Sequence, residues 1–221
     1  MDKRSTLLVR HADPAVLRSQ GVPKEMFERL YAGGAAWEIG KPQPEVVKIE
    51  NAGGFRGSVL DIGCGPGENA IFLAQKGYAV HAIDFLSSVI ERVRDRYRAE
   101  CESLRIVFEV ADALSLDRLG KTFDCVLDAG MFHGLSDQHR LAYEQSLRAI
   151  SVPGTTLHMI CFSKEETRPG GPRRIGVDEV RASLGASWDI RSTRQAEYNA
   201  MIFDTPAPAK AWAIELVRRA G

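Results

Sequence analysis

The chain has 221 residues, of which 44% are hydrophobic and 26% charged, so it is long enough and apolar enough to form a folded domain with a substantial core. Lysine plus arginine and aspartate plus glutamate number 29 each, and the resulting zero net charge argues against a nucleic-acid binder that relies on a basic face. The four cysteines are scattered without a C-x-x-C pair and no window approaches 18 apolar residues, so we expect no metal site, no disulfide framework, no membrane span and a cytoplasmic setting.

Residues 1–56 precede the first predicted strand and are expected to be mostly helical. Short helices are predicted, each with a proline near its first turn, over Pro14–Gln20, Pro23–Tyr31 and Pro44–Ala52. The segment Ala36–Pro44, which leads into the last of these helices, is rich in turn-forming residues. We expect this N-terminal extension either to pack on the sheet or to cover the functional site, and residues 57–221 to form the core of the same domain, 1–221.

From residue 58 onward, apolar runs of strand length alternate with helical patterns. Strands are predicted at Val59–Ile62, Tyr78–Ile83, Leu104–Val110, Phe123–Asp128 and Thr155–Phe162. The helices predicted between them are Glu68–Lys76, Ser88–Glu102 and Asp137–Ile150. Because repeated strand–helix alternation implies a parallel sheet covered on both faces, we predict an α/β, doubly wound fold.

The end of the chain changes character. A helix predicted at Val177–Leu184 is followed by two runs that alternate like strands, Trp188–Ala196 and Ala211–Val217. A short connection near Pro206 and Pro208 joins these two runs, so we expect them to pair antiparallel.

The segment Ser58–Gly67, S-V-L-D-I-G-C-G-P-G, carries the strongest functional signal. Its apolar run gives way to glycines at alternate positions, Gly63, Gly65 and Gly67, and a helical pattern follows. In doubly wound folds, a buried strand that ends in glycines and leads into a helix brings the backbone close to a nucleotide. A tight turn without a ligand is the alternative interpretation.

The charges around these glycines indicate which nucleotide is bound. The dinucleotide fingerprint G-x-G-x-x-G needs a small third residue, but Glu68 stands at that position. No lysine or arginine occurs between Gly57 and Gln75, whereas Asp61 lies among the residues leading to the glycines, so a pyrophosphate would meet carboxylates. A cationic nucleoside fits better, and S-adenosylmethionine, with a sulfonium, an ammonium and a single carboxylate, is the cofactor we predict.

Acidic residues also end the next two predicted strands. Asp84, in H-A-I-D-F, can accept hydrogen bonds from both hydroxyls of a ribose, although capping the following helix is an alternative. Asp112, in V-A-D-A-L, can accept from an adenine amino group while Ala113 and Leu114 present backbone to the ring. A turn-forming role for Asp112 is nearly as well supported. Together with the glycine turn, these strand ends predict one connected site.

These residues resemble the class I S-adenosylmethionine-dependent methyltransferases over nearly the whole chain. The segment Val59–Gly67 resembles the first motif of that family, and His81–Asp84, Ala111–Ala113 and Phe123–Asp128 resemble its ribose, adenine and fourth-strand motifs. The resemblance implies a Rossmann-like sheet of seven strands whose last strand is antiparallel. It also implies that the cofactor is contacted by Trp37, Asp61, Gly63, Cys64, Gly65, Gly67, Asp84, Phe85, Asp112, Ala113, Leu114 and Asp128.

A narrower likeness is carried by W-E-I-G-K-P-Q-P, residues 37–44, which is similar to a segment in thiopurine methyltransferase-like and tellurite-resistance-like small-molecule methyltransferases. In such proteins this segment lies over the cofactor, which implies that Trp37 packs near its methionine part. D-A-G-M-F-H, residues 128–133, and G-P-R-R, residues 171–174, are similar to bacterial members that act on small phenols or heterocycles.

Methyl transfer requires the acceptor atom, the methyl carbon and the sulfur to be held in line, and a neutral acceptor must also lose a proton. His133 follows the fourth predicted strand and is the candidate general base, with packing or loop orientation as the alternative. Asp128 is a candidate for the cofactor's ammonium group or for the acceptor pocket. The segment Ser163–Ile175 is expected to form a mobile lid, in which arginines attract an acidic acceptor or are simply solvated, namely Arg168, Arg173 and Arg174.

The sequence therefore predicts methyl transfer to an oxygen, sulfur or nitrogen atom of a small molecule, and it does not distinguish among the three. An NAD(P)-dependent oxidoreductase and a cofactor-binding regulatory protein without turnover are the alternatives. A methyltransferase acting on RNA or protein is disfavoured by the neutral charge and by the lack of an N-P-P-Y-like motif after the fourth strand.

Overall fold

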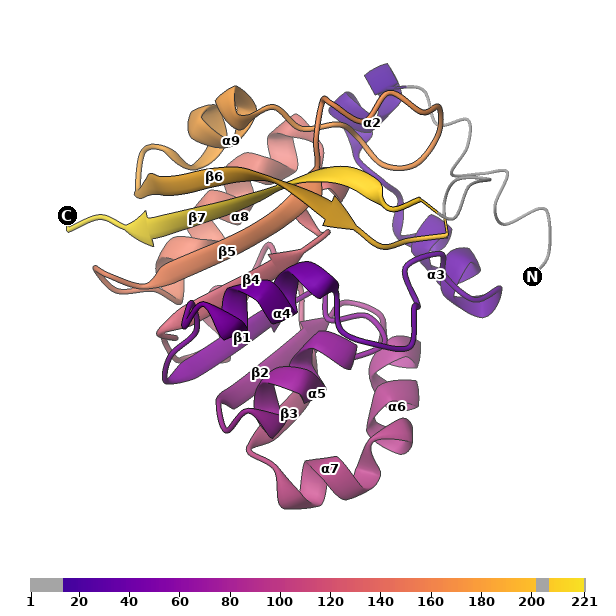
Figure 1. Cartoon of the computed structure of the whole chain (residues 1–221), viewed down its shortest axis with the longest axis vertical. Helices are drawn as coiled ribbons and strands as arrows, with labels where there is room; N and C mark the ends of the chain where they lie inside the picture. The colour runs from indigo at the N-terminus through magenta and orange to yellow at the C-terminus, as the bar shows by residue number, and fades with distance from the viewer. Residues whose placement is uncertain (1–13, 202–206, 221) are drawn as a thin grey trace.

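The computed structural model describes residues 14–201 and 207–220, and the strands in this part of the chain form one mixed sheet (Figure 1). Their order across the sheet is β3-β2-β1-β4-β5-β7-β6. The strands are β1 Ser58–Ile62, β2 Ala79–Asp84, β3 Ile106–Val110, β4 Cys125–Ala129, β5 Thr156–Phe162, β6 Trp188–Tyr198 and β7 Ala209–Arg218. Neighbours among β1 to β5 pair parallel, whereas β7 runs antiparallel to both β5 and β6. The predicted seven-stranded, mostly parallel Rossmann-like sheet with an antiparallel last strand is confirmed.

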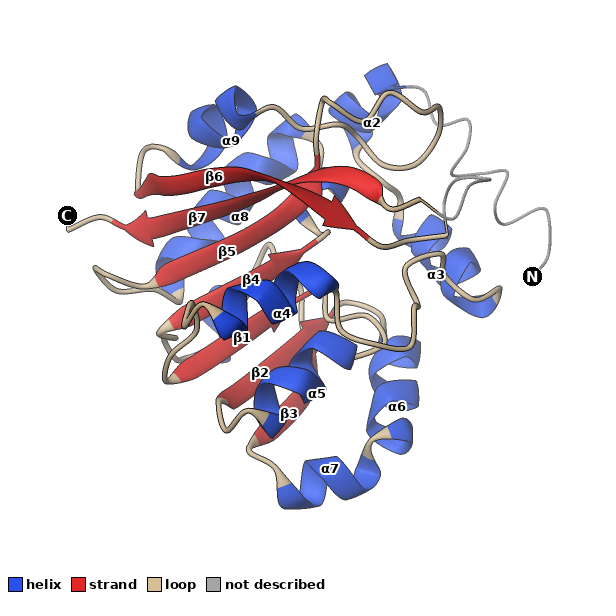
Figure 2. Ribbon diagram, viewed as in Figure 1, coloured by secondary structure: helices blue, strands red, loops and turns tan. Residues whose placement is uncertain are grey.

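Helices cover both faces of this sheet (Figure 2). They are α2 Pro14–Gln20, α3 Lys24–Ala32, α4 Pro44–Asn51, α5 Glu68–Gln75, α6 Ser87–Arg96, α7 Arg98–Ser103, α8 Asp137–Ala149 and α9 Val177–Leu184, with short 3-10 turns at Leu116–Leu119 and Phe132–Gly134. Helices α4, α5 and α6 bury their apolar residues in one core cluster, and α8 and α9 bury theirs in a second cluster on the other face. None of the helices described here is long and apolar enough to cross a membrane.

Alternation along the central strands builds these two clusters. In β1, Val59 belongs to the first cluster while Leu60 and Ile62 belong to the second, because successive side chains of a strand point to opposite faces. All of these positions are buried, as expected for a parallel sheet that is covered on both sides. Asp61 is therefore placed in an apolar interior, where a charged group is costly unless something compensates it.

Several predicted elements differ from the structure by one or two residues at an end, and one predicted helix is divided in two. The helix predicted over Ser88–Glu102 breaks at Tyr97 into α6 and α7, since Tyr97 leaves the helical conformation and α7 buries none of its residues. The strand predicted to end at Ala196 continues to Tyr198, which proves important for the site. Residues 1–13 of the predicted extension and Pro206 of the predicted turn lie outside the described residues.

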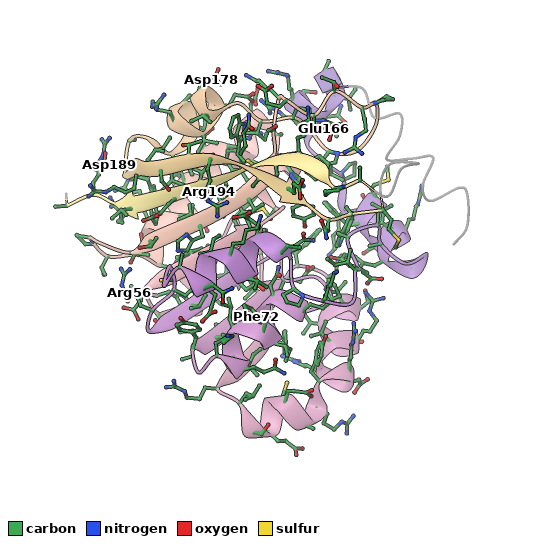
Figure 3. The ribbon with its side chains drawn as sticks, in the orientation of Figure 1. Arg56, Phe72, Glu166, Asp178, Asp189 and Arg194 are labelled. Atoms are coloured by element: carbon green, nitrogen blue, oxygen red, sulfur yellow. The ribbon has the colours of Figure 1, made fainter. Side chains whose placement is uncertain are left out.

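The carboxyl ends of the parallel strands meet at one edge of the sheet, which is where the glycines lie. Ile62, the last residue of β1, stands beside Ile83 of β2 and Asp128 of β4. In Figure 1 this edge faces right, toward α3. Arg56 and Asp189, labelled in Figure 3, lie at the opposite edge. Parallel pairing therefore brings the predicted glycine loop and the acidic strand ends together.

Candidate functional site

The three glycines after β1 all adopt a backbone conformation that favours glycine, with φ of 68° at Gly63, 51° at Gly65 and 84° at Gly67. Space is also limiting. A Cβ atom added to Gly65 would lie 2.8 Å from the hydroxyl of Tyr31, and one added to Gly67 would lie 2.9 Å from Val93. The loop is thus bare backbone at positions where a side chain would meet the rest of the fold, and its glycines leave backbone groups uncovered, as in loops that bind nucleotides.

An aromatic cover, formed by Phe27, Tyr31, Trp37 and Phe85, lies beside this loop. The indole Nε1 of Trp37 donates to the Tyr31 hydroxyl at 3.0 Å, and the two rings pack edge to face. Phe27 joins Trp37 to Phe85 through further edge-to-face contacts. Two of these residues, Trp37 and Phe85, were predicted to be site residues. Tyr31 and Phe27 were missed, because a helical pattern alone does not show what its side chains face.

Asp84 ends β2 directly beside the loop. Its Oδ2 accepts a hydrogen bond from the backbone N–H of Gly65 at 3.2 Å, and its Oδ1 accepts from that of Leu86 at 3.0 Å. Burial nevertheless raises the pKa of Asp84 above its usual range. A carboxylate has about four lone-pair positions, so this one still has capacity to accept hydroxyl groups while it fixes the loop.

Asp61, in β1, is almost fully buried, and its Oδ2 atom has no hydrogen-bond partner among the described residues. Burial, followed by the negative charges of Asp128 and Asp84, raises its pKa to about 7. An unpaired carboxylate in such surroundings is expensive, because it has lost its hydration and gained two like-charged neighbours. A ligand that brings positive charge to this place would offset that cost.

Asp128, in β4, is fully buried but well supplied with donors. Its Oδ1 accepts from the backbone N–H groups of Met131 and Phe132 at 2.8 and 3.1 Å, and its Oδ2 accepts from the Tyr143 hydroxyl at 3.0 Å. Burial still raises its pKa to about 6. These contacts make Asp128 an organiser of the turn after β4, and its role toward the cofactor's ammonium group or the acceptor stays a prediction.

The predicted adenine-contacting stretch follows β3. Asp112 is exposed, and its Oδ1 accepts from the backbone N–H of Leu114 at 2.8 Å, which is the turn-forming arrangement considered from the sequence. Ala113 and Leu114 are partly buried. The neighbouring Ala111 N–H donates to the Asp84 carbonyl, which ties this turn to the end of β2.

Cys64, the remaining predicted contact, is buried within the glycine loop, and burial raises the pKa of its thiol.

A second aromatic group, the ring triad of His133, Phe162 and Tyr198, gathers where β4, β5 and β6 end. The ring centroids lie 5.1 Å apart for His133–Phe162, 5.5 Å for Phe162–Tyr198 and 6.2 Å for His133–Tyr198. The Tyr198 hydroxyl donates to the carbonyl of Ala129, the last residue of β4, at 2.9 Å. Phe162 and Tyr198 are buried, whereas His133 keeps part of its surface exposed.

The contacts of His133 bear on its predicted role as a general base. Its Nδ1 accepts a hydrogen bond from the backbone N–H of Phe162 at 3.3 Å, so the proton of the neutral ring is on Nε2. Burial, with the nearby guanidinium groups of Arg174 and Arg140, lowers the pKa of His133 to about 3. A ring in this state is neutral at pH 7 and has no free lone pair, which favours a hydrogen-bond donor over a base.

The arginines of the predicted lid are engaged with the protein itself. Arg174 donates to the carbonyls of Glu166, Arg168, Gly170 and Pro172, so its guanidinium fills the inside of the loop. Arg168 binds the Glu166 carboxylate and the carbonyls of Ala207 and Pro208. Figure 3 shows Glu166 in this loop, above the carboxyl edge of the sheet.

Arg173 is also turned inward. It is buried and pairs with Asp137 of α8 and Glu179 of α9, the latter shared with Arg140. The base of the loop is closed by a bridge between Ser163 and Ile175. We expected these arginines either to attract an acceptor or to be solvated. In the structure their guanidinium groups bind carboxylates and carbonyls within the fold.

Comparison with known proteins identifies a family and several relatives that this chain resembles. Residues 59–154 match the family model described as a methyltransferase domain. The chain is 30% identical to the 2-heptyl-1-hydroxyquinolin-4(1H)-one methyltransferase of Mycobacteroides abscessus over 76% of its own length and 78% of that protein. It is also 30% identical to the thiopurine S-methyltransferase of Azotobacter vinelandii, over 58% of its own length and 65% of that protein.

A solved structure, described as "Conversion of a Disulfide Bond into a Thioacetal Group during Echinomycin Biosynthesis", resembles this chain in fold and sequence. The TM-score is 0.78 and the identity 32%, and the match covers 89% of this chain and 93% of the other. The likeness therefore extends beyond residues 59–154 to the N-terminal helices and the strands at the end of the chain.

Proposed function

This chain belongs to the S-adenosylmethionine-dependent methyltransferases, and from that premise we propose that its acceptor is a small planar aromatic molecule methylated on a hydroxyl oxygen. Membership of the family confirms the predicted cofactor and enzyme class, and the match to a thiopurine S-methyltransferase confirms the narrower resemblance. The oxidoreductase and the regulatory protein without turnover lose their support. The observation that carries the choice of acceptor is the ring triad of His133, Phe162 and Tyr198 at the end of β4.

The residues around the glycine loop fit the cofactor. The Oδ2 of Asp61 has no hydrogen-bond partner among the described residues and lies near the negative charges of Asp128 and Asp84, which suits a ligand with a sulfonium and an ammonium group. We propose that Asp84 holds the ribose and that the backbone around Asp112 holds the adenine. We propose that Trp37 covers the methionine part. When bound, S-adenosylmethionine supplies an electrophilic methyl group.

The ring triad supports an aromatic acceptor. The His133 ring, which Phe162 and Tyr198 hold in place, offers a surface against which a planar ring can pack, and such a contact is worth about 0.5–1.5 kcal/mol beyond area burial. The partly exposed His133 is the member of the triad that a ligand can reach. The relative in Mycobacteroides abscessus is named for a hydroxyquinolinone, which is a planar hydroxylated heterocycle.

A neutral His133 suits an acceptor hydroxyl that has already ionised. Its Nε2–H can donate to an oxyanion and hold that atom in line with the methyl carbon. No proton then has to be removed by the enzyme during transfer. The cover and the loop that follows β5 would serve to exclude water from the reaction.

A panel of acceptors tests this proposal. We expect hydroxylated heterocycles and acidic phenols to be methylated faster than thiols or amines of similar size, with the rate following the ionisation of the acceptor. For each acceptor, kcat/KM measured from pH 5 to 9 should therefore break at the pKa of that acceptor. A break near pH 6.5 shared by all acceptors would instead identify a histidine base, and preference for thiols or amines would contradict the oxygen assignment.

We further propose that residues 1–221 form one domain in which residues 1–56 cover the cofactor site, and that the protein acts in the cytoplasm. The position of the aromatic cover against the glycine loop supports the first point. The four cysteines, none of which is paired, support the second. A fragment that begins at residue 57 should therefore bind cofactor more weakly than the whole chain.

A further inference from the structure

Gln43 makes an unusual set of contacts at the start of α4. Its side-chain Nε2 donates to the Asn199 carbonyl at 2.9 Å, and its Oε1 accepts from the Asn199 N–H at the same distance. The side-chain amide therefore pairs with both backbone groups of Asn199, as a neighbouring strand would. Gln43 is buried, so neither partner has water as an easy substitute.

The backbone of Gln43 reaches a third element. Its N–H donates to the Oδ1 of Asn69 at 2.9 Å, and Asn69 lies in the first turn of α5, two residues after the last glycine of the loop. A second link runs parallel to the side-chain contact, from the Met201 N–H to the Ala36 carbonyl at 2.7 Å. The segment from Ala36 to Gln43, the cover segment, is thus held at both ends by residues 199–201.

The residue next to Asn199 also contacts the end of β4, beside which the ring triad lies. Tyr198, next to Asn199 in the chain, donates its hydroxyl proton to the Ala129 carbonyl at the end of β4. The same oxygen would lie 2.8 Å from a Cβ atom added to Gly130, so it occupies space that only glycine leaves open. Residues 198–201 therefore contact both the cover segment and the strand that carries Asp128.

We propose that Gln43 is a positioning residue for cofactor binding: its amide clamps the backbone of Asn199 and thereby holds Trp37 and Tyr31 closed over the glycine loop. This inference rests on the proposed placement of the cofactor beneath the aromatic cover. Gln43 itself touches no reacting atom. Its effect is to keep the 36–43 segment, the first turn of α5 and the end of β6 in one arrangement, which a bound cofactor would otherwise have to assemble.

The fold of α4 does not depend on this clamp. Val46 and Ile49 anchor the helix in the first core cluster, and Glu45 pairs with Arg194 of β6, which Figure 3 labels. Removing the Gln43 amide should therefore release the cover segment without unfolding the helix behind it. Glutamate at position 43 keeps the shape but loses the donor and places an oxygen against the Asn199 carbonyl.

The test is a calorimetric titration with S-adenosylhomocysteine, using wild type, Gln43→Ala, Gln43→Glu and the control Gln195→Ala. Gln195 lies on the same strand as Tyr198 but is exposed, so its loss should leave affinity unchanged. For both Gln43 variants we expect Kd to rise about tenfold, the effect of losing buried hydrogen bonds. KM for S-adenosylmethionine should rise similarly while kcat at saturation changes less than twofold.

Hydrogen exchange of the unliganded proteins provides a readout that does not involve the cofactor. The amides of Asn199 and Met201 should exchange faster in both Gln43 variants, while those of α4 keep their protection. If wild type binds and both folded variants bind as tightly, the clamp is overturned and the proposed function stands. If wild type itself does not bind S-adenosylhomocysteine, the cofactor placement fails and the clamp fails with it.

Discussion

The carboxylate of Asp61 shows at the scale of one residue how the site trades stability for binding. It is buried beside Asp84 and Asp128, and its pKa of about 7 means that the folded protein without ligand holds a proton there that an unfolded chain would release. The stability that this proton contributes is present below about pH 4 and is lost as the pH rises through 7. A cationic ligand would restore it.

Asp61→Asn should therefore stabilise the unliganded protein at alkaline pH. We expect unfolding free energy at pH 8 to rise by about 1–3 kcal/mol relative to wild type, because the unpaired charge is removed. At about pH 4, near the pKa of an aspartate in the unfolded chain, the difference should nearly vanish. Thermal unfolding of both proteins at the two pH values measures this, and an equal difference at both would show that the Asp61 charge is not the cause.

At the scale of the element, β6 extends two residues beyond its predicted end and so brings Tyr198 to β4. Such a contact spans 69 positions in sequence, and no local pattern indicates it. The same holds for Gln43 and Asn199, which are 156 positions apart. The alternation of residues in the sequence predicted the position of β6 in the chain. The contacts that join its side chains to other elements depend on the tertiary fold.

Tyr198→Phe tests this connection between the strands. Removing the hydroxyl leaves the Ala129 carbonyl without its donor, so we expect a loss of about 0.5–1.5 kcal/mol in stability and a several-fold lower kcat. Tyr78→Phe is the matched control, because Tyr78 lies immediately before β2, at the opposite edge of the sheet. Unfolding curves and steady-state rates give both readouts. Equal kcat in wild type and Tyr198→Phe would separate Tyr198 from the site.

At the scale of the whole molecule, the sequence predicted the sheet, the parallel and antiparallel directions of its strands, and the edge at which the glycine loop and the acidic strand ends meet. These follow from local chemistry: glycines after a buried strand, and acidic residues where parallel strands end. The surroundings of the arginines after β5 were harder to predict, since only the structure shows that Arg173 and Arg174 bind groups within the protein. The role of a base was predicted for His133 from its position after β4 and stays a prediction; its contact with the Phe162 N–H is visible only in the structure.

The same view of the molecule explains why the zero net charge of the chain is uninformative about its site. Arginines elsewhere in the fold form ion pairs and bind loop carbonyls, while the edge that carries the glycine loop holds buried carboxylates. That local imbalance, not the overall charge, distinguishes a cationic cofactor from a pyrophosphate.

The most direct test is calorimetric titration of the protein with S-adenosylmethionine from pH 6 to 8, in buffers of different ionisation enthalpy. A pKa of about 7 for Asp61 predicts that binding at pH 7 releases about half a proton, and that affinity rises with pH across this range. NADH should not bind. Binding of S-adenosylmethionine without proton release, or binding of NADH with comparable affinity, would contradict the assignment of this carboxylate site to a positively charged cofactor.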